Sequence, residues 1–224
     1  MLKSVLFLLV TICFLTTPTR AYEAYNNLYS LVLRKQQENS PTQNIKLVSA
    51  KEVYSTENLA ADDVCAVAVL EAEQNYHIKK GLLQTIATVE SGRWSDLRQK
   101  RVAWPWTVQY NGHGRYYKTK EEAVAAIKSL QAQGITNIDV GCMQINLKYH
   151  GHAFNSVEDA IEPKHNVAYS AGFLRSLYDR NGNNWQKTAM QYHSKNHSQG
   201  LIYKNRLERY YAKYINPELP QTLF

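Results

Sequence analysis

The sequence predicts a mainly α-helical domain with one small β element. Apolar residues recur at helical spacing through most of the chain beyond residue 61, and capping or helix-stopping residues separate these segments. Residues 93–118 break the helical pattern and contain an Asn-Gly pair between two strand-like segments. With the less organised N-terminal stretch set aside, about 160 residues remain, which is enough for one domain with its own core.

Residues 1–21 have the composition of an export signal. Lys3 supplies a positive charge, residues 5–15 form a nearly unbroken apolar run, and residues 19–21 resemble a small-x-small cleavage site. The run is short for a membrane span, and no second apolar stretch follows. We therefore expect an exported, periplasmic or extracellular protein without stable membrane insertion after signal removal. An uncleaved N-terminal anchor is the alternative.

The charge of the chain is modestly positive. The formal net charge is +7, and loss of Lys3 and Arg20 with the signal lowers it to +5. This balance suits an anionic polymer, although ordinary solubilising charge is the preferred explanation. Basic residues do not cluster with interleaved aromatics, so no nucleic-acid partner is predicted. Residues 22–60 are polar and include Pro41, and we expect a flexible or weakly ordered segment there.

The organised region begins with two predicted helices. Asp62 and Asp63 are candidate caps for a helix that ends near residue 76. The second helix, residues 82–91, has apolar residues at helical spacing, and Gly92 is expected to end it in the left-handed conformation. These apolar residues are Leu82, Leu83, Ile86 and Val89. The short connection predicts an antiparallel pair.

A hairpin and several more helices follow. Residues 106–110 and 115–118 are the expected strands around Asn111-Gly112. Thr119 and Glu122 form a capping-box pair that opens the next helix. The remaining predicted helices are a short one capped by Ser156, one over residues 166–180, one capped by Asn184, and a last one with Tyr203, Leu207, Tyr210 and Tyr214 on one stripe. The domain boundaries are placed at residues 61–216, with 217–224 as a C-terminal tail.

Glu90 is the strongest catalytic candidate. It lies in the last turn of the second predicted helix, where the negative end of the helix dipole and apolar neighbours both raise the pKa of a carboxyl group. A glutamate that stays protonated near neutral pH can act as the general acid that cleaves a glycosidic bond. On this segment alone, a solvated residue at a frayed helix end is the alternative.

Three motifs in order resemble the soluble lytic transglycosylase (SLT) catalytic domain of the lysozyme-like superfamily. They are residues 90–92 (Glu-Ser-Gly), residues 141–146 (Gly-Cys-Met-Gln-Ile-Asn) and residues 191–194 (Gln-Tyr-His-Ser). The similarity extends from about residue 64 to residue 211. Cys142 stands where the family usually has leucine, and His193 stands where it usually has asparagine, so the role of that asparagine is not assigned to His193.

The resemblance implies a bilobed, lysozyme-like helical domain with a small β-hairpin and a groove that binds glycan strands. It also implies cofactor-free cleavage of the β-1,4 bond between N-acetylmuramic acid (MurNAc) and N-acetylglucosamine (GlcNAc) in peptidoglycan. Glu90 takes the place of the single catalytic acid. The residues implied in substrate binding are Ser91, Met143, Gln144, Asn146 and Tyr192. Trp104 and Trp106 are either a stacking wall for sugar rings or core residues.

A second carboxylate would indicate another mechanism. Glycoside hydrolases commonly use two carboxyl groups, whereas one glutamate suffices when the C6 hydroxyl of the substrate closes a 1,6-anhydro ring. Asp139 is the best candidate for a second group, although turn residues are often aspartates. A goose-type lysozyme-like hydrolase is therefore the first alternative. A non-catalytic wall-binding or secretion-assembly protein is the second, and a secretion or conjugation apparatus is a candidate partner.

Histidine spacing predicts no metal site, because it matches no common zinc-ligand pattern. Cys65 and Cys142 are the two cysteines that remain after signal removal. In an oxidising compartment we expect them to form a disulfide, with two buried thiols as the alternative.

Overall fold

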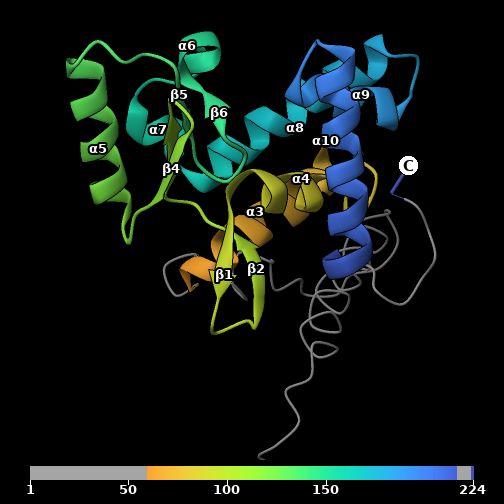
Figure 1. Ribbon diagram of the computed structural model, residues 1–224, viewed down its shortest axis with the longest axis horizontal. Helices are drawn as coiled ribbons and strands as arrows, with labels where there is room; N and C mark the ends of the chain where they lie inside the picture. The colour runs from red at the N-terminus through yellow and green to blue at the C-terminus, as the bar shows by residue number, and fades with distance from the viewer. Residues whose placement is uncertain (1–59, 216–222) are drawn as a thin grey trace, which may run out of the picture. The chain divides into compact units, whose positions relative to one another are not determined.

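Eight α-helices and two small antiparallel sheets make up the part of the chain that the computed structural model describes, residues 60–215 and 223–224 (Figure 1). The predicted mainly helical, lysozyme-like fold class is confirmed. The expected export signal, the N-terminal segment up to residue 59 and most of the C-terminal tail lie outside the described residues. None of the described helices is both long and apolar enough to span a membrane.

The elements follow one another in this order. The helices are α3 (Ala61–Asn75), α4 (Leu82–Ser91), α5 (Lys120–Ala132), α6 (Leu147–His150), α7 (Val157–Ile161), α8 (Pro163–Arg180), α9 (Trp185–His193) and α10 (His197–Tyr210). A 3₁₀ turn (Gly151–Ala153) follows α6, and a π-helical turn (Tyr211–Ile215) follows α10. The strands are β1 (Gly92–Ser95), β2 (Lys100–Ala103), β3 (Thr107–Tyr110), β4 (His113–Tyr116), β5 (Ile138–Val140) and β6 (Ile145–Asn146).

The predicted hairpin is present and forms part of a larger sheet. Strands β3 and β4 pair with Tyr110 opposite His113, and Asn111 and Gly112 between them have φ angles of 47° and 77°. Positive φ at both central residues is what a two-residue hairpin turn requires. Strands β5 and β6 extend this sheet, while β1 and β2 form a separate hairpin. These four strands were not predicted, because segments of two to four residues carry too few positions for a periodic pattern.

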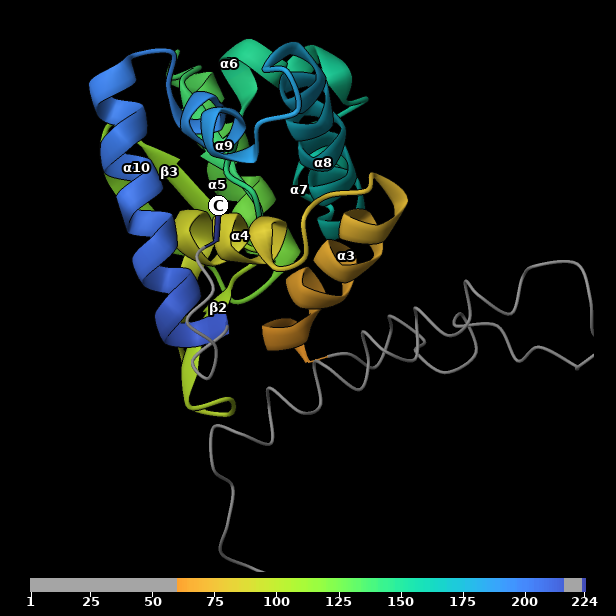
Figure 2. The same cartoon turned by 90° about the vertical axis from the view of Figure 1, so that its right-hand side faces the viewer.

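The buried apolar residues fall into two clusters. The larger cluster is centred on α4, whose Leu82, Leu83, Ile86 and Val89 are all buried as predicted. Helix α4 packs against α3 and α10, and lies between them in Figure 2. The smaller cluster joins α5 and α7 to strands β3 and β5. Each fully buried aliphatic side chain contributes about 1.5–3 kcal/mol.

Several capping predictions are confirmed. Thr119 accepts a hydrogen bond from the Glu122 amide at 3.2 Å, and Ser156 and Asn184 cap α7 and α9 in the same way. The Glu122 carboxylate accepts from Lys118 N at 2.9 Å instead of the Thr119 amide that a capping box would use. Helix α8 begins at Pro163, three residues before the predicted start, because proline is well suited to the first helical position.

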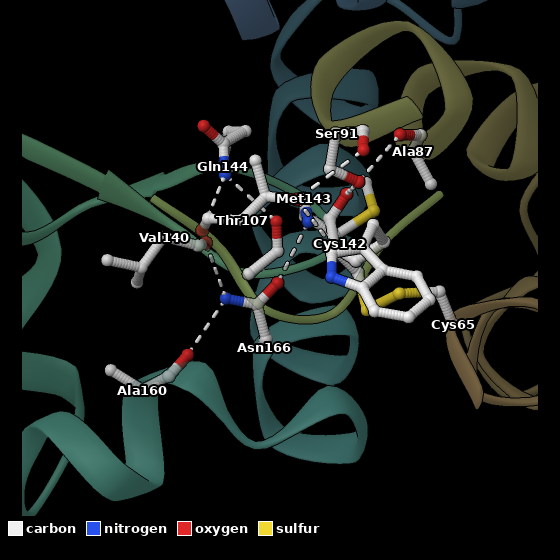
Figure 3. The surroundings of a disulfide bond; sticks show 12 residues. Cys65, Ala87, Ser91, Thr107, Val140, Cys142, Met143, Gln144, Ala160 and Asn166 are labelled. Atoms are coloured by element: carbon white, nitrogen blue, oxygen red, sulfur yellow. Dashed lines mark hydrogen bonds between the residues drawn. A yellow bond between two sulfur atoms is a disulfide. The ribbon is translucent and has the colours of Figure 1, made fainter. Parts of the chain in front are cut away.

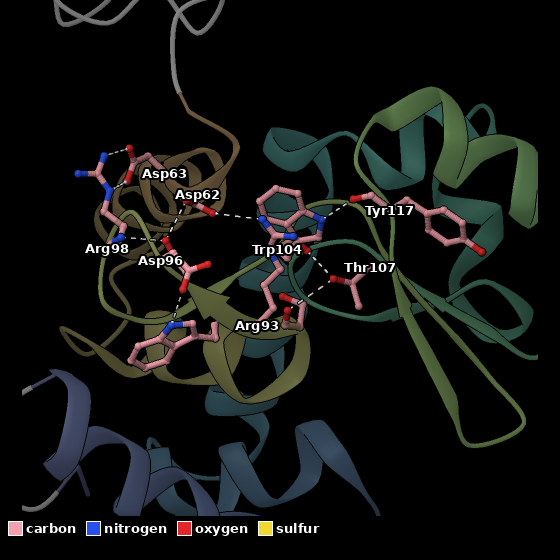
Figure 4. Close-up of polar contacts among 11 residues, drawn as sticks. Asp62, Asp63, Arg93, Asp96, Arg98, Trp104, Thr107 and Tyr117 are labelled. Carbon is pink, nitrogen blue, oxygen red and sulfur yellow. Dashed lines mark hydrogen bonds and ion pairs between the residues drawn. The ribbon is translucent and has the colours of Figure 1, made fainter.

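Asp62 and Asp63 do not cap α3, contrary to the prediction. The cap position is Ala60, which makes no side-chain bond, and both aspartates lie in the first helical turn. Asp62 accepts a hydrogen bond from Ser95 Oγ at 2.8 Å, and Asp63 pairs with Arg98 (Figure 4). The carboxylates thus connect α3 to the β1–β2 hairpin while keeping a favourable position at the positive end of the helix.

Gly92 also differs from its predicted role. Its backbone is extended, with φ −67° and ψ 129°, and is not left-handed. A Cβ atom at Gly92 would lie 2.1 Å from the carbonyl oxygen of Thr88. Glycine is therefore required because the chain leaves α4 against the helix's own last turn, so that any side chain would displace the segment that carries Glu90.

A buried carboxyl group accepts hydrogen bonds from backbone amides at the N-terminal end of α4. Glu73 of α3 is 2% exposed. Its Oε2 accepts from Gly81 N at 2.9 Å, and its Oε1 accepts from Leu83 N at 2.8 Å and Gln84 N at 3.2 Å. Burial raises the pKa of Glu73 to about 7, although the three backbone hydrogen bonds lower it. Glu73 thereby satisfies amides that the start of a helix leaves without partners.

The Glu73→Gln substitution should destabilise the domain. Both Glu73 oxygens accept hydrogen bonds from backbone amides. In the glutamine variant an NH₂ group replaces one of these oxygens, so that two donors face each other and one hydrogen bond is lost. We expect the free energy of unfolding at pH 7 to fall by about 1–3 kcal/mol in urea denaturation. Glu71→Gln, at an exposed position of the same helix, is the matched control and should change stability little. Equal stability of both variants would contradict the proposed capping role.

Candidate active site

Glu90 lies at the C-terminal end of α4 against helix α10. Tyr203 of α10 donates its hydroxyl hydrogen bond to Glu90 Oε1 at 2.5 Å, and Arg206 donates to the Val89 carbonyl at 2.9 Å. Burial raises the pKa of Glu90 to about 7. The Tyr203 hydrogen bond and the Arg206 charge lower it, and the Asp139 charge raises it further. A carboxyl group with this pKa can both give up and take back a proton near neutral pH.

Tyr203 was expected only as one residue of an apolar stripe, and its contact with Glu90 was not predicted. The two residues are 113 positions apart in the sequence. Tyr203 is 2% exposed, and a buried tyrosine hydroxyl usually requires a hydrogen-bond partner. That requirement is the one signal in the sequence that points to a polar contact at this position, and it does not identify Glu90 as the partner.

The second motif forms a tight loop between β5 and β6. Gln144 has a φ of 49°, a left-handed conformation that is uncommon for residues other than glycine. Its Nε2 donates to Gly141 O at 3.0 Å and to Thr107 O at 3.2 Å. Within the described part of the chain, Gln144 Oε1 is buried and has no hydrogen-bond partner. Strained backbone and an unsatisfied acceptor together are typical of a ligand-binding position.

Asn166 of α8 holds this loop in place (Figure 3). Its Oδ1 accepts from Met143 N at 2.9 Å, while its Nδ2 donates to Val140 O at 3.0 Å and to Ala160 O at 2.8 Å. Gly141 has a φ of 81°, and a Cβ atom there would lie 2.5 Å from Asn166 Nδ2. The sequence indicated Asn166 only as the start of a helix, so its supporting role was missed.

The structure contains the expected disulfide between Cys65 and Cys142. Both residues are fully buried and their Cα atoms are 5.7 Å apart. The bond joins α3 to the second-motif loop beside Ser91, whose hydroxyl donates to Cys142 O at 2.7 Å and to Ala87 O at 3.1 Å (Figure 3). Ser91 therefore links the end of α4, next to Glu90, directly to this loop.

The residues implied in substrate binding differ in accessibility. Ser91 and Met143 are fully buried, and Asn146 caps α6 while donating to Asn137 and Asp139. The Tyr192 hydroxyl donates to Met143 O at 3.0 Å, and burial followed by the Glu90 charge raises its pKa. Ser91, Met143 and Tyr192 thus meet at the loop that presents Gln144. Direct contact of these residues with a substrate stays a prediction.

Trp104 is a core residue. It is 4% exposed, its indole nitrogen donates to Tyr117 O at 2.7 Å, and the Arg93 guanidinium lies 3.3 Å from the centre of its ring (Figure 4). Trp106 is partly buried and packs against the smaller hydrophobic cluster. The core interpretation therefore holds for Trp104, because its ring is buried and its polar atom is hydrogen-bonded within the protein.

Asp139 lies close enough to influence Glu90. Its Oδ1 accepts from Asn146 Nδ2 at 2.8 Å, and burial raises the pKa of Asp139 although this hydrogen bond lowers it. Its charge in turn raises the pKa of Glu90. In residues 60–215 and 223–224, no group of three or more histidine, cysteine, aspartate or glutamate side chains could hold a metal ion.

The described residues thus define a mainly helical, lysozyme-like domain with a partly buried glutamate at the end of a central helix. The profile of the family described as Transglycosylase SLT domain matches residues 68–211. The chain therefore belongs to the SLT transglycosylase family, whose members are peptidoglycan lytic transglycosylases. Comparisons with curated proteins and with solved structures returned no match.

Removal of the disulfide should lower stability. The bridge spans 77 positions, and the chain-entropy model gives about 4 kcal/mol for a loop of that length. We expect the doubly substituted Cys65→Ala, Cys142→Ala protein to unfold at lower urea concentration than the oxidised wild type. Reductant should shift the wild-type midpoint toward that of the variant and leave the variant unchanged. Two titratable thiols in denatured, non-reduced protein would contradict the assignment.

Proposed function

We propose that the protein cleaves the MurNAc-β-1,4-GlcNAc bond of peptidoglycan by lytic transglycosylation, with Glu90 acting first as the acid and then as the base. The observation that carries the proposal is the partly buried Glu90 carboxyl group, which has a pKa of about 7 and accepts a hydrogen bond from the Tyr203 hydroxyl on one of its oxygens. Activity on peptidoglycan follows from the family.

The first step is protonation of the leaving group. Tyr203 donates to Glu90 Oε1, so the acidic proton resides on Oε2 and is available to the glycosidic oxygen. Transfer of this proton breaks the bond between C1 of MurNAc and that oxygen. The Tyr203 hydrogen bond and the nearby Arg206 charge then stabilise the carboxylate that forms.

The second step forms the anhydro ring. The Glu90 carboxylate takes the proton of the C6 hydroxyl of the same sugar, and the C6 oxygen bonds to C1. The N-acetyl group of the substrate stabilises the cationic centre in between, so that no second protein carboxylate is needed. Glu90 is then protonated again and ready for another cycle.

Buried Gln144 Oε1 supports a role for this residue in holding the sugar. An unsatisfied acceptor next to the loop backbone matches the hydroxyl and N-acetyl N–H donors of an amino sugar. Ser91, Met143, Asn146 and Tyr192 contribute by keeping the loop rigid. Rigid placement of a binding group near an acid is a large part of what an enzyme supplies.

A goose-type lysozyme-like hydrolase is the second candidate function, because the Asp139 charge acts on Glu90. In that case Asp139 would activate a water molecule. Its Oδ1 is already engaged by Asn146, and this favours the single-acid route. The paired Glu90 and Tyr203 side chains likewise favour an enzyme over a non-catalytic wall-binding or secretion-assembly protein.

The proposed location is outside the cytoplasm. Proteins of the SLT family act on the cell wall, and the disulfide between Cys65 and Cys142 is suited to an oxidising compartment. Residues 1–21 supply the proposed signal. The polar residues 22–60 are the proposed site for a secretion or conjugation apparatus, which needs a local opening in the wall.

Glu90→Gln should fold normally and lose nearly all cleavage, because a carboxamide cannot give up and retake a proton. In the wild type, kcat/KM should fall about tenfold per pH unit above pH 7, since deprotonation removes the acid form of Glu90. Release of soluble fragments from purified peptidoglycan is the measurement. Glu121→Gln, at an exposed position of α5, is the control. Near wild-type turnover by the Glu90 variant would refute this mechanism.

The main products should end in 1,6-anhydro-MurNAc. An anhydro end is lighter than a hydrolysed end by one water and resists borohydride reduction, because it has no free anomeric carbon. Reduction followed by mass spectrometry therefore distinguishes the routes. Asp139→Asn should keep the anhydro character of the products, since a carboxamide can still accept from Asn146. Predominantly reducible ends, or a folded Asp139 variant without turnover, would favour the hydrolase.

A further inference from the structure

His193 lies flat on the tyrosine that contacts Glu90. The imidazole, at the end of α9, is stacked on the Tyr203 ring of α10, with centroids 4.4 Å apart and an angle of 3° between the ring planes. The Tyr203 hydroxyl in turn lies 2.5 Å from Glu90 Oε1. His193 is exposed, whereas Tyr203 is buried. The imidazole therefore shields one face of the tyrosine ring from solvent.

We propose that His193 is a positioning residue of the active site, which acts through Tyr203 by keeping the tyrosine hydroxyl on the Glu90 carboxyl group. This inference rests on the catalytic role proposed for Glu90. It assigns a function to one of the two positions at which this chain departs from the usual motifs.

A planar side chain is needed for this role. The parallel rings share a large contact, and such aromatic pairs contribute beyond the area that they bury. Tyr203 packs into the larger hydrophobic cluster on its other sides, so loss of the imidazole would open the remaining side to water. Water would then compete for hydrogen bonds to the Tyr203 hydroxyl and to Glu90. Both the distance between these two groups and the desolvation of Glu90 would change.

Partial desolvation and one nearby positive charge both favour the neutral form of His193. Although the residue stays in contact with solvent, packing of its ring against the protein removes part of its hydration; this desolvation, followed by the Arg206 guanidinium, lowers the pKa of His193 below its ordinary value. The other ionisable groups of this cluster are Tyr203 on α10, Glu90 on α4 and Tyr192, the preceding residue of α9. A neutral ring covers Tyr203 without adding a second positive charge beside Glu90, where Arg206 already stabilises the carboxylate.

Kinetics of His193 variants provide the first test. His193→Ala should lower kcat by about ten- to hundredfold with little change in KM, because a displaced catalytic group is costly to turnover. His193→Phe keeps a flat ring and should restore most of the activity, whereas His193→Asn should not. In a Tyr203→Phe background, His193→Ala should cause little further loss. His197→Ala, at an exposed position of α10, should behave as the wild type.

The second test does not depend on activity. The Tyr203 hydroxyl proton should give a downfield NMR signal, assigned by its absence in Tyr203→Phe. This signal should be lost to water exchange in His193→Ala and persist in His193→Phe. An unchanged signal in His193→Ala would overturn the proposal. It would also be overturned if His193→Ala raised only KM and did so equally in the Tyr203→Phe background, because that outcome indicates substrate binding by His193. Failure of the Glu90 mechanism would show separately as an active Glu90→Gln enzyme.

Discussion

The structure depends on the burial of helix α4 with a carboxyl group at each end. Desolvation raises the pKa of both Glu73 and Glu90 to about 7. The helix dipole favours the anion at the N-terminal end and disfavours it at the C-terminal end. Three backbone amides accommodate Glu73, whereas Glu90 has one tyrosine hydroxyl. The first carboxyl group therefore stabilises the helix, and the second stays available for proton transfer.

The second constraint is the support of the loop over residues 141–144. Four elements bond to it: α3 through the disulfide, α4 through Ser91, α8 through Asn166 and α9 through Tyr192. All three hydrogen bonds end on backbone atoms of this loop. Such support offsets the cost of the left-handed conformation of Gln144, which is about 1–3 kcal/mol. Loop rigidity and the placement of Gln144 are thus one property of the fold.

Local sequence patterns predicted the helices well, but they predicted poorly which distant residues the helix ends contact. Thr119, Ser156 and Asn184 cap their helices because each bonds the amide three residues ahead, an interaction that needs no distant partner. Asp62 and Asp63 failed as predicted caps because α3 begins before them, and their side chains bond the distant residues Ser95 and Arg98. The prediction that Gly92 ends α4 in a left-handed conformation was wrong. Glycine is needed there because the carbonyl oxygen of Thr88 approaches its Cα closely, and this approach depends on the path of β1.

The sequence by itself determined the helical class and the family, and it predicted Glu90 as the acid and the pairing of the two cysteines, because each of these follows from periodicity, motif order or composition. Tertiary structure decided which groups tune and support the acid. The partners of Tyr203, Asn166 and Glu73 lie 113, 23 and 8 to 11 positions away, and the local sequence of these residues does not identify those partners. Long-range packing brings them together, since burial leaves each polar group dependent on a specific partner.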